Sequence, residues 1–181
     1  LQQDFQKRLP GPARIEWTRR LLDNSIEMSN NSFLSVNRFQ KRFWSMLSAH
    51  DWISVSAPTS SGKSFIMTRW IRELVHRRPS ATIVYLVPTR ALISEVERNL
   101  TELFSSDGLV NAKISTIPLA RSLSAGVANI LVFTQERLHL LLTAIPGLGV
   151  DALIVDEAHK VGDRQRGVLL QSVVERVAQS N

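Results

Sequence analysis

The stretch that decides the fold reads Ala57, Pro58, Thr59, Ser60, Ser61, Gly62, Lys63 and Ser64. Its last three residues form the Gly-Lys-Ser end of a phosphate-binding loop, and an alanine stands where the first glycine of that loop usually lies. The apolar run at residues 52–56 predicts a strand before the stretch, and residues 65–71 predict a helix after it. A strand, a loop and a helix in this order are the context that a phosphate-binding loop requires.

These residues suit a nucleoside triphosphate bound with Mg²⁺. Successive backbone N–H groups and the positive end of the following helix attract anionic phosphates. Lys63 is expected to reach the terminal phosphates, and the Ser64 hydroxyl is expected to bind Mg²⁺. Because Gly-Lys-Ser also occurs by chance in ordinary loops, the stretch alone leaves its function open.

A second stretch, Asp156-Glu157-Ala158-His159, follows the apolar run at residues 152–155. The run predicts a strand, so both carboxylates would lie at its carboxyl end, where ligands bind in open α/β sheets. Alone, the stretch could also be an ordinary helix start, because acidic residues are favoured there. The two stretches together, in this order and each after an apolar run, predict a site for a nucleoside triphosphate and Mg²⁺.

The composition indicates a globular protein. The chain has 181 residues, 44% hydrophobic and 21% charged, which is enough for one domain with a substantial core. It has no cysteine, which excludes disulfides and thiolate metal sites and fits a reducing compartment. We therefore expect a cytoplasmic protein, with the nucleus left open for a eukaryotic source. Pro146 and Asp151 interrupt the most apolar tract, so no membrane span is expected.

Positive charge is concentrated in the first half of the chain. Residues 1–90 contain 14 Lys or Arg and 6 Asp or Glu, whereas residues 91–181 contain 8 and 10. Arginine provides 17 of the 22 basic side chains, and its planar fork suits phosphate groups. A basic face of this kind fits a polyanion, although the charge alone favours a solubilising surface.

Strand-like and helix-like segments alternate along the chain. Apolar runs at residues 81–87, 112–117, 129–133 and 152–155 predict buried strands. Between and around them, apolar residues recur at three- and four-residue intervals and predict helices. These helical stripes are Ile15, Leu21, Leu22 and Ile26; Val36, Phe39, Phe43, Trp44 and Leu47; Leu92, Val96, Leu100 and Leu103; Leu138, Leu141, Leu142 and Ile145; and Leu170, Val173, Val174 and Val177. The alternation predicts an α/β fold with a mostly parallel sheet and helices on both faces.

With these motifs placed, residues 33–167 resemble the first RecA-like motor domain of a superfamily 2 helicase of the DExH/DEAH type. Residues 57–64 match motif I and residues 156–159 match motif II. Residues 87–92 resemble motif Ia, and residues 134–138 resemble motif Ib, where many relatives have proline instead of Gln135. Asp163, Arg166 and Gly167 resemble the processive DExH branch. The resemblance implies a RecA-like P-loop NTPase that uses ATP and Mg²⁺.

The resemblance also implies a role for each residue of the nucleotide site. Lys63 and Ser64 would bind phosphates and Mg²⁺, with Thr59, Gly62 and neighbouring amides completing the phosphate site. Asp156 would hold Mg²⁺, Glu157 would orient or deprotonate the attacking water, and His159 would link the ATP site to the rest of the motor. Gln40, in Arg38-Phe39-Gln40, resembles the adenine-sensing glutamine. A glutamine on an amphipathic helix is, however, ordinarily just solvated.

Motifs Ia and Ib imply contacts with a nucleic-acid backbone. A strand end followed by a helix start gives free N–H groups, a hydroxyl and, at Arg90, a guanidinium, all of which suit phosphate. Threonine also caps helices in proteins of every kind, which is the simpler explanation for each motif taken singly. We expect sequence-independent binding of single-stranded DNA or RNA through Pro88, Thr89, Arg90, Thr134 and Gln135.

The expected domains are an N-terminal accessory segment at residues 1–32 and the ATP-binding domain at residues 33–181. No Ser-Ala-Thr triplet, the family's motif III, follows Asp156. Because the chain starts at Leu1 and lacks this motif, we expect a fragment that is inactive alone and whose partner is the second RecA-like domain of a longer protein. An ATP-driven protein translocase remains an alternative, although the short connections leave no room for its peptide-binding insertion. A nucleotide-sensing scaffold is another, although a sensor would not need Glu157.

Overall fold

The computed structural model describes residues 10–106, 111–158 and 164–180. The chain divides into two compact units, Leu1–Glu73 and Leu74–Asn181, and the boundary falls inside one helix, α4 (Lys63–Arg77). Among the described residues, none of the helices has the length and apolar composition that crossing a bilayer requires.

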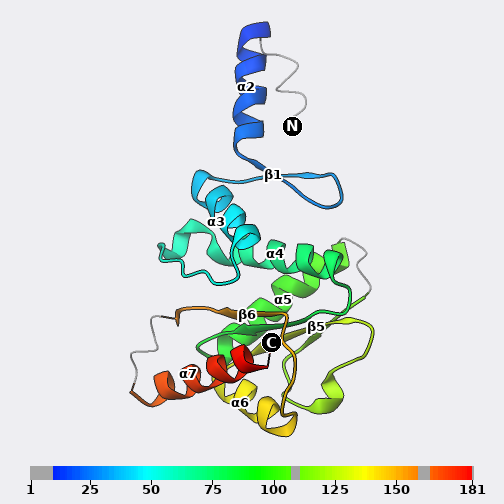
Figure 1. Ribbon diagram of the computed structural model, residues 1–181. Helices are drawn as coiled ribbons and strands as arrows, with labels where there is room; N and C mark the ends of the chain where they lie inside the picture. The colour runs from blue at the N-terminus through cyan, green and yellow to red at the C-terminus, as the bar shows by residue number, and fades with distance from the viewer. Residues whose placement is uncertain (1–9, 107–110, 159–163, 181) are drawn as a thin grey trace. The chain divides into compact units, whose positions relative to one another are not determined.

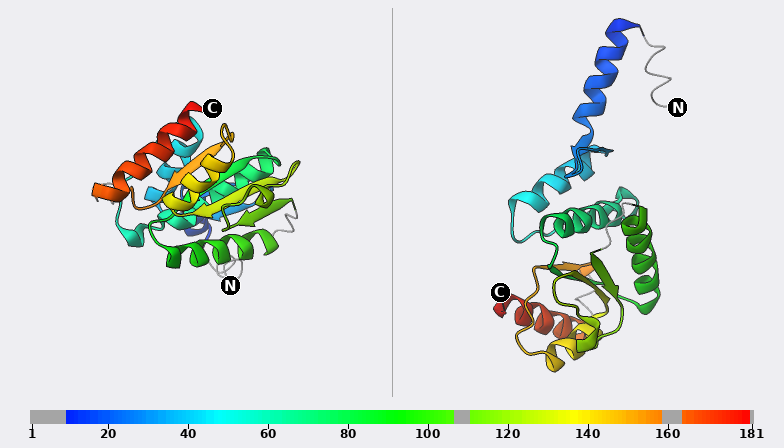
Figure 2. Two further views of the ribbon diagram at one scale, coloured as in Figure 1. Left: turned by 90° about the horizontal axis from the view of Figure 1, so that it is seen from below. Right: turned by 90° about the vertical axis from the view of Figure 1, so that its right-hand side faces the viewer.

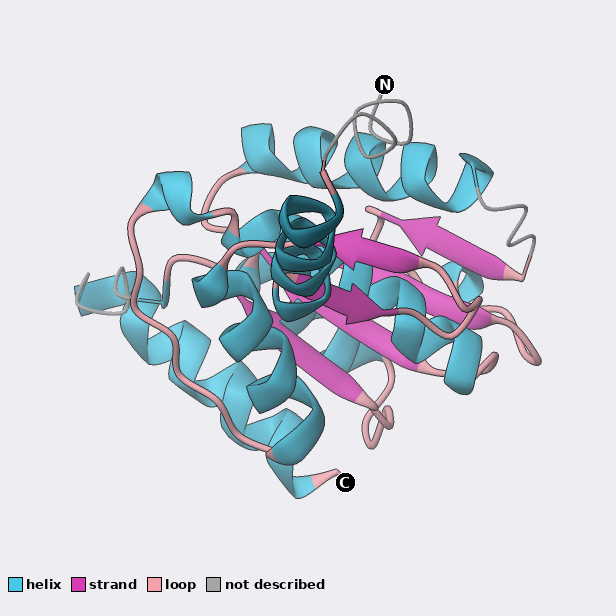
Figure 3. Cartoon of the chain, turned by 90° about the horizontal axis from the view of Figure 1, so that it is seen from above, coloured by secondary structure: helices cyan, strands magenta, loops and turns pink. Residues whose placement is uncertain are grey.

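The second unit contains a four-stranded parallel sheet (Figure 3). Its strands, in the spatial order β4-β5-β3-β6, are β4 (Ala112–Ser115), β5 (Ala128–Phe133), β3 (Thr82–Leu86) and β6 (Ala152–Val155). Every residue of β5 is buried, as expected for an interior strand of a sheet that is covered on both faces. The predicted parallel sheet is confirmed.

Helices cover both faces of this sheet (Figures 1 and 2). Side chains alternate between the faces along a strand, so Val84 and Leu86 point one way and Ile83 and Tyr85 the other. Val84 and Leu86 belong to a buried cluster with Leu131, Phe133 and apolar side chains of α6 (Gln135–Ala144) and α7 (Arg164–Gln179). The opposite face packs against α5 (Arg90–Ser106), which buries Ile93, Val96, Leu100, Leu103 and Phe104. Each fully buried side chain of this kind stabilises the fold by about 1.5–3 kcal/mol relative to an exposed one.

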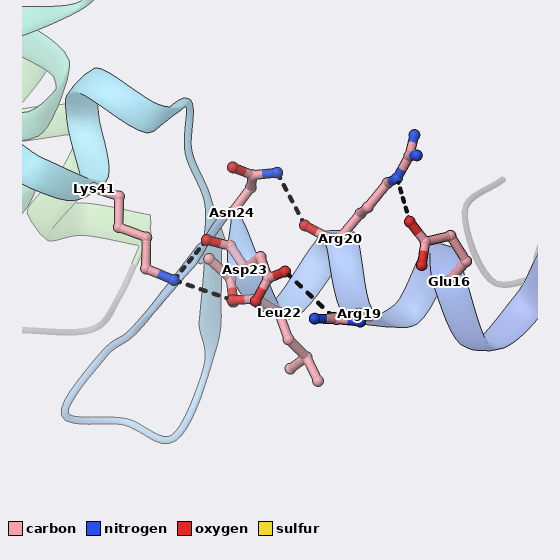
Figure 4. Close-up of polar contacts among 8 residues, drawn as sticks. Glu16, Arg19, Arg20, Leu22, Asp23, Asn24 and Lys41 are labelled. Atoms are coloured by element: carbon pink, nitrogen blue, oxygen red, sulfur yellow. Dashed lines mark hydrogen bonds and ion pairs between the residues drawn. The ribbon is translucent and has the colours of Figure 1, made fainter.

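The first described element of the first unit is α2 (Gly11–Asp23), where the sequence predicts an accessory helix. The helix ends at Asp23, and Lys41 Nζ donates hydrogen bonds to the carbonyls of Leu22 and Asp23 in its last turn at 3.3 and 2.6 Å (Figure 4). Ile26, which we expected on this helix, is instead buried in β1 (Ser25–Glu27). β1 pairs with β2 (Phe33–Ser35) in an antiparallel hairpin that the sequence analysis did not predict.

α3 (Arg38–Ala49) and the short 3₁₀ helix η1 (Thr59–Ser61) complete the first unit together with the start of α4. The strand expected at residues 52–56 is wrong, because these residues have no regular secondary structure. Trp52 is 73% exposed, Ile53 and Val55 are only half-buried, and no described strand pairs with the segment. The stabilisation from so little apolar burial does not offset the conformational entropy that is lost when an extended strand is ordered.

Candidate functional site

The loop at residues 57–64 turns sharply before it enters α4. Pro58 is extended, and the Ser61 N–H and hydroxyl both donate to its carbonyl, at 3.1 and 2.7 Å. Gly62 then takes a left-handed conformation with φ 78°, which favours glycine. Lys63 and Ser64 are the first two residues of α4. The first N–H groups of a helix have no partner within it, so this turn leaves donors available at the loop.

The Lys63 ammonium lies over this loop. Its Nζ donates to the carbonyls of Ala57 and Pro58, the second at 3.0 Å. A cation at the positive end of a helix costs free energy, about 0.3–1 kcal/mol, instead of stabilising the helix. The interaction with the helix dipole therefore does not favour a lysine here, although its two carbonyl partners do. An anion bound among the helix N–H groups would interact favourably with the ammonium as well.

Gln40 contacts the same loop from α3. Its Nε2 donates to the Ser61 carbonyl at 3.4 Å, and a Cβ added to Gly62 would overlap that nitrogen. Gln40 therefore contacts the residues of motif I, and its expected contact with adenine stays a prediction. Asn37, which the sequence analysis did not single out, caps α3 beside it. Its signal was present in the sequence, because Asn-x-x-Gln before an amphipathic stretch is the spacing of a capping box.

In the second unit, three strands end side by side. The Val87 N–H donates to the Phe133 carbonyl and the Asp156 N–H donates to the Leu86 carbonyl, both at 2.9 Å. These bonds extend the ladders past the last residues of β3, β5 and β6. The residues that follow each strand, which belong to motifs Ia, Ib and II, therefore share the carboxyl edge of the sheet.

Asp156 and Glu157 form the acidic part of this edge. One carboxylate oxygen of Asp156 accepts from the Glu157 N–H at 2.9 Å, and within the described ranges its other oxygen accepts no hydrogen bond. Glu157 is half-buried and has φ 50°, a left-handed conformation that costs a non-glycine residue about 1–2 kcal/mol. Strain of this kind is concentrated at functional sites. His159 lies outside the described residues.

Motifs Ia and Ib differ in exposure. Pro88 is half-buried, whereas Thr89 and Arg90 are exposed at the start of α5. Thr134 is the N-cap of α6 but only 6% exposed, and its side chain makes no capping hydrogen bond. Gln135, the first residue of α6, is half-buried and its Nε2 contacts Glu136 at 3.4 Å. Arg90 is the only charged residue among the five predicted contacts, and it is exposed.

Ser64 in the first unit and Asp156 in the second each offer a hard oxygen of the kind that Mg²⁺ prefers among its ligands, and Mg²⁺ usually keeps several waters as well. The Ser64 side chain is exposed at the start of α4, and Asp156 is half-buried with one carboxylate oxygen directed to a backbone N–H. Among the described residues, no group of three or more His, Cys, Asp or Glu side chains could hold a metal on its own. That Lys63 and Asp156 share one nucleotide stays a prediction.

Comparisons with known proteins identify the family of the chain. A family model described as DEAD/DEAH box helicase matches residues 37–181. The ATP-dependent DNA helicase Hel308 of Aeropyrum pernix is 35% identical over 129 residues, which cover 70% of this chain and 17% of that protein. The Lhr helicase/probable uracil glycosylase of Mycolicibacterium smegmatis is 31% identical over 176 residues, with 84% and 12% covered. The Hachiman protein HamB of Bacillus cereus is 29% identical over 134 residues, with 71% and 12% covered.

A solved structure shows the same fold at lower sequence identity. It is a nuclease-deletion mutant of the Type ISP restriction-modification enzyme LlaGI in complex with a DNA substrate mimic, with a TM-score of 0.53 and 14% identity over 70% of this chain and 15% of that one. The matched part of the chain spans only 12–17% of the length of Hel308, the Lhr helicase and HamB. Since the family model covers residues 37–181, including the phosphate loop and the Asp-Glu-Ala-His stretch, the chain belongs to the DEAD/DEAH box helicase family.

Proposed function

We propose that this chain is the ATP-binding lobe, the first RecA-like domain, of an ATP-dependent nucleic-acid helicase or translocase. Residues 33–181 would form this domain and residues 1–32 an accessory segment. The observation that carries the proposal is the Lys63 ammonium at the N-terminal end of α4, because an anion bound there would interact favourably with the ammonium and with the first N–H groups of the helix. The terminal phosphates of ATP are such an anion.

We propose a role for each of the nucleotide-binding residues. Amides of residues 57–64 and the Lys63 ammonium would bind phosphate oxygens, and the Ser64 hydroxyl and Asp156 carboxylate would hold Mg²⁺. When bound, the ion neutralises phosphate charge and orients the reacting group. Glu157 would position a water molecule and accept its proton at the side-chain carboxylate. Phosphoryl transfer depends mainly on such positioning and on stabilisation of charge.

The nucleic acid would bind at the carboxyl edge of the sheet through its sugar-phosphate backbone. The exposed Thr89 and Arg90 would contact phosphates directly, and Pro88, Thr134 and Gln135 would shape the adjoining strand-to-helix turns. Because contacts with the sugar-phosphate backbone carry no direct sequence information, we propose sequence-independent binding of single strands. Hel308 is by name a DNA helicase and the LlaGI complex holds a DNA mimic, which supports a nucleic-acid substrate.

Efficient hydrolysis would also require the second RecA-like domain of a longer chain. The transition state needs positive charge on the transferred group, and an arginine finger typically contributes about 10³–10⁵ in rate. We propose that this arginine comes from the second domain, so that the 181-residue chain alone shows essentially no hydrolysis stimulated by nucleic acid. Phosphate release measured with and without single strands tests this. Stimulated turnover that Glu157→Gln abolishes would contradict the requirement for a second domain.

The nucleotide site itself is tested by isothermal titration with Mg-ATP. Lys63→Ala removes a charged contact, so the affinity should fall at least about tenfold. Lys113→Ala is the matched control, because Lys113 donates to Ser124 at 3.0 Å and lies outside the phosphate loop. Equal affinity of the Lys63→Ala variant and the unsubstituted chain would show that the loop is not the nucleotide site.

A further inference from the structure

We propose that the hairpin of β1 and β2 positions α4, the helix at which the phosphate loop ends, through a contact between Ser29 and Glu73. The inference rests on the proposed nucleotide site at residues 57–64. It makes Ser29 and Glu73 positioning residues of that site. It also gives residues 25–32, which the sequence analysis assigns to an accessory segment, a part in nucleotide binding.

The turn of the hairpin binds a buried carboxylate on α4. Glu73 is only 3% exposed, and it belongs to the same unit as the hairpin. The Ser29 N–H donates to both of its carboxylate oxygens at 3.1 Å, and the Ser29 hydroxyl donates to Oε2. Arg72, also on α4, is 8% exposed and places Nη1 3.5 Å from Glu73 Oε1. The hairpin therefore contacts α4 at a buried pair of opposite charges.

The turn that carries Ser29 is itself fixed by hydrogen bonds. The Met28 N–H donates to the Ser32 carbonyl and the Asn31 N–H donates to the Met28 carbonyl, both at 2.9 Å. The Ser32 N–H and hydroxyl both donate to Asn30 Oδ1, at 3.1 and 2.6 Å. Met28 is 4% exposed, so the turn is also packed through an apolar side chain. Ser29 therefore reaches α4 from a backbone with a defined conformation.

The open end of the hairpin is anchored as well. Ile26 of β1 and Val36, directly after β2, are 5% and 6% exposed. The Val36 N–H donates to the Asn24 carbonyl at 2.8 Å, which joins the two strands beyond their last pair. Because both ends of the hairpin are held, its turn can restrict a helix that it contacts.

The contact between Ser29 and Glu73 adds direction to the packing of α4. Apolar side chains such as Ile66 and Ile71, both 0% exposed, already bury part of this helix, but apolar burial is not directional. A carboxylate that accepts an N–H and an O–H from one residue instead favours one height and one rotation of the helix. Burying charges costs hydration energy, and the best-attested use of such a contact is to select a single register.

The register of α4 matters because its first residue is expected to bind phosphate. From Lys63 to Glu73 there are ten residue steps (73 − 63), which span about 15 Å of helix. A tilt of α4 by about 4° would therefore shift Lys63 by about 1 Å relative to Glu73. Restriction of a site to its bound geometry raises affinity, so the hairpin contact should strengthen the binding of Mg-ATP.

The experiment is isothermal titration of the 181-residue chain with Mg-ATP, at a temperature at which each variant is folded. Ser29→Ala removes the hydroxyl donor from an exposed turn residue, and Glu73→Gln removes the charge but keeps the size of the side chain. Each should raise the Kd about three- to tenfold. Ser29→Thr keeps a hydroxyl and should retain the affinity. Since the two residues act through one contact, the double variant should bind no more weakly than Glu73→Gln.

Two control variants separate positioning from stability. Ser32→Ala removes a hydroxyl of the same turn that donates to Asn30, so the Kd should be unchanged. Ile130→Val removes a methylene group from a residue of β5 that is 0% exposed, and should lower the midpoint of thermal unfolding by about 1–6 °C. Because Ile130 belongs to the second unit, the folded variant should retain its Kd.

A lower unfolding midpoint with an unchanged Kd in Ser29→Ala and Glu73→Gln would overturn the proposal, because the contact would then serve the fold alone. An equal rise of the Kd in either control variant, or additive losses in the double variant, would overturn it as well. Should Glu73→Gln fail to fold, Ser29→Ala and Ser29→Thr still decide.

The nucleotide site itself fails in a different way. If Lys63→Ala leaves the Kd for Mg-ATP unchanged, residues 57–64 are not the nucleotide site. A failure of the positioning contact alone leaves the loss of affinity in Lys63→Ala intact.

Discussion

The phosphate loop and the carboxyl edge of the sheet are both sites at the start of helices, but different interactions hold them. Backbone hydrogen bonds between parallel strands and a buried apolar cluster stabilise the sheet edge. Leu131 and Phe133, at the end of β5, are fully buried in that cluster. The loop instead depends on a left-handed glycine and on a few polar contacts from Lys63 and Gln40. Substitutions should therefore act on global stability at the sheet edge and on ligand affinity at the loop.

The largest expected effect is in the sheet. Leu131→Ala in β5 removes a side chain that is 0% exposed and leaves a cavity, so the free energy of unfolding should fall by about 2–5 kcal/mol. Urea denaturation followed by circular dichroism measures this change. Val55→Ala is the control in the segment before the loop, where the side chain is only half-buried, and it should cost less than about 1 kcal/mol. Equal costs at the two positions would remove the distinction between the regions.

A smaller effect, and one on affinity, is expected at the turn of the loop. Gly62→Ala and Gly147→Ala both place a Cβ on left-handed backbone, with φ 78° and 79°, and each should cost about 1–2 kcal/mol. A Cβ at Gly147 has no neighbour within 4 Å, whereas one at Gly62 displaces Gln40. Only Gly62→Ala should therefore weaken Mg-ATP binding, which titration of both variants measures. Equal affinities would show that the turn does not control the phosphate site.

The difference in apolar burial between the sheet and the segment before the loop also explains which elements the sequence predicts correctly. Runs such as residues 129–133 are apolar throughout, because a sheet covered on both faces buries every residue of an interior strand. These runs predict the sheet and its helices correctly, and with them the edge that carries Thr134 and Asp156. The segment at residues 52–56 has a similar pattern but too little burial, so its predicted strand is wrong.

The sequence analysis missed features that leave no periodic pattern of apolar residues. The hairpin of β1 and β2 spans only three residues in each strand, too few for a period of two to stand out. Asn37 acts through hydrogen bonds to Gln40, which a periodicity of apolar residues does not reveal. Motif residues such as Lys63 and Glu157 were identified by residue type and spacing, whereas the left-handed conformation of Glu157 is evident only in the structure.

The smallest expected effect is at Arg90, on the exposed start of α5. If its guanidinium binds one phosphate of a single strand, Arg90→Ala should reduce the slope of log affinity against log salt concentration by about 0.7, because fewer counterions are released. Fluorescence anisotropy titrations of a labelled single strand at several salt concentrations measure that slope.

Arg20→Ala is the matched control, since Arg20 is exposed on α2 and pairs with Glu16 at 2.9 Å (Figure 4). Its replacement removes the same charge from the chain but no proposed phosphate contact, so the slope should be unchanged. Equal slopes for Arg90→Ala and the unsubstituted chain would place the nucleic acid away from the sheet edge, and equal reductions in both variants would indicate a general effect of net charge.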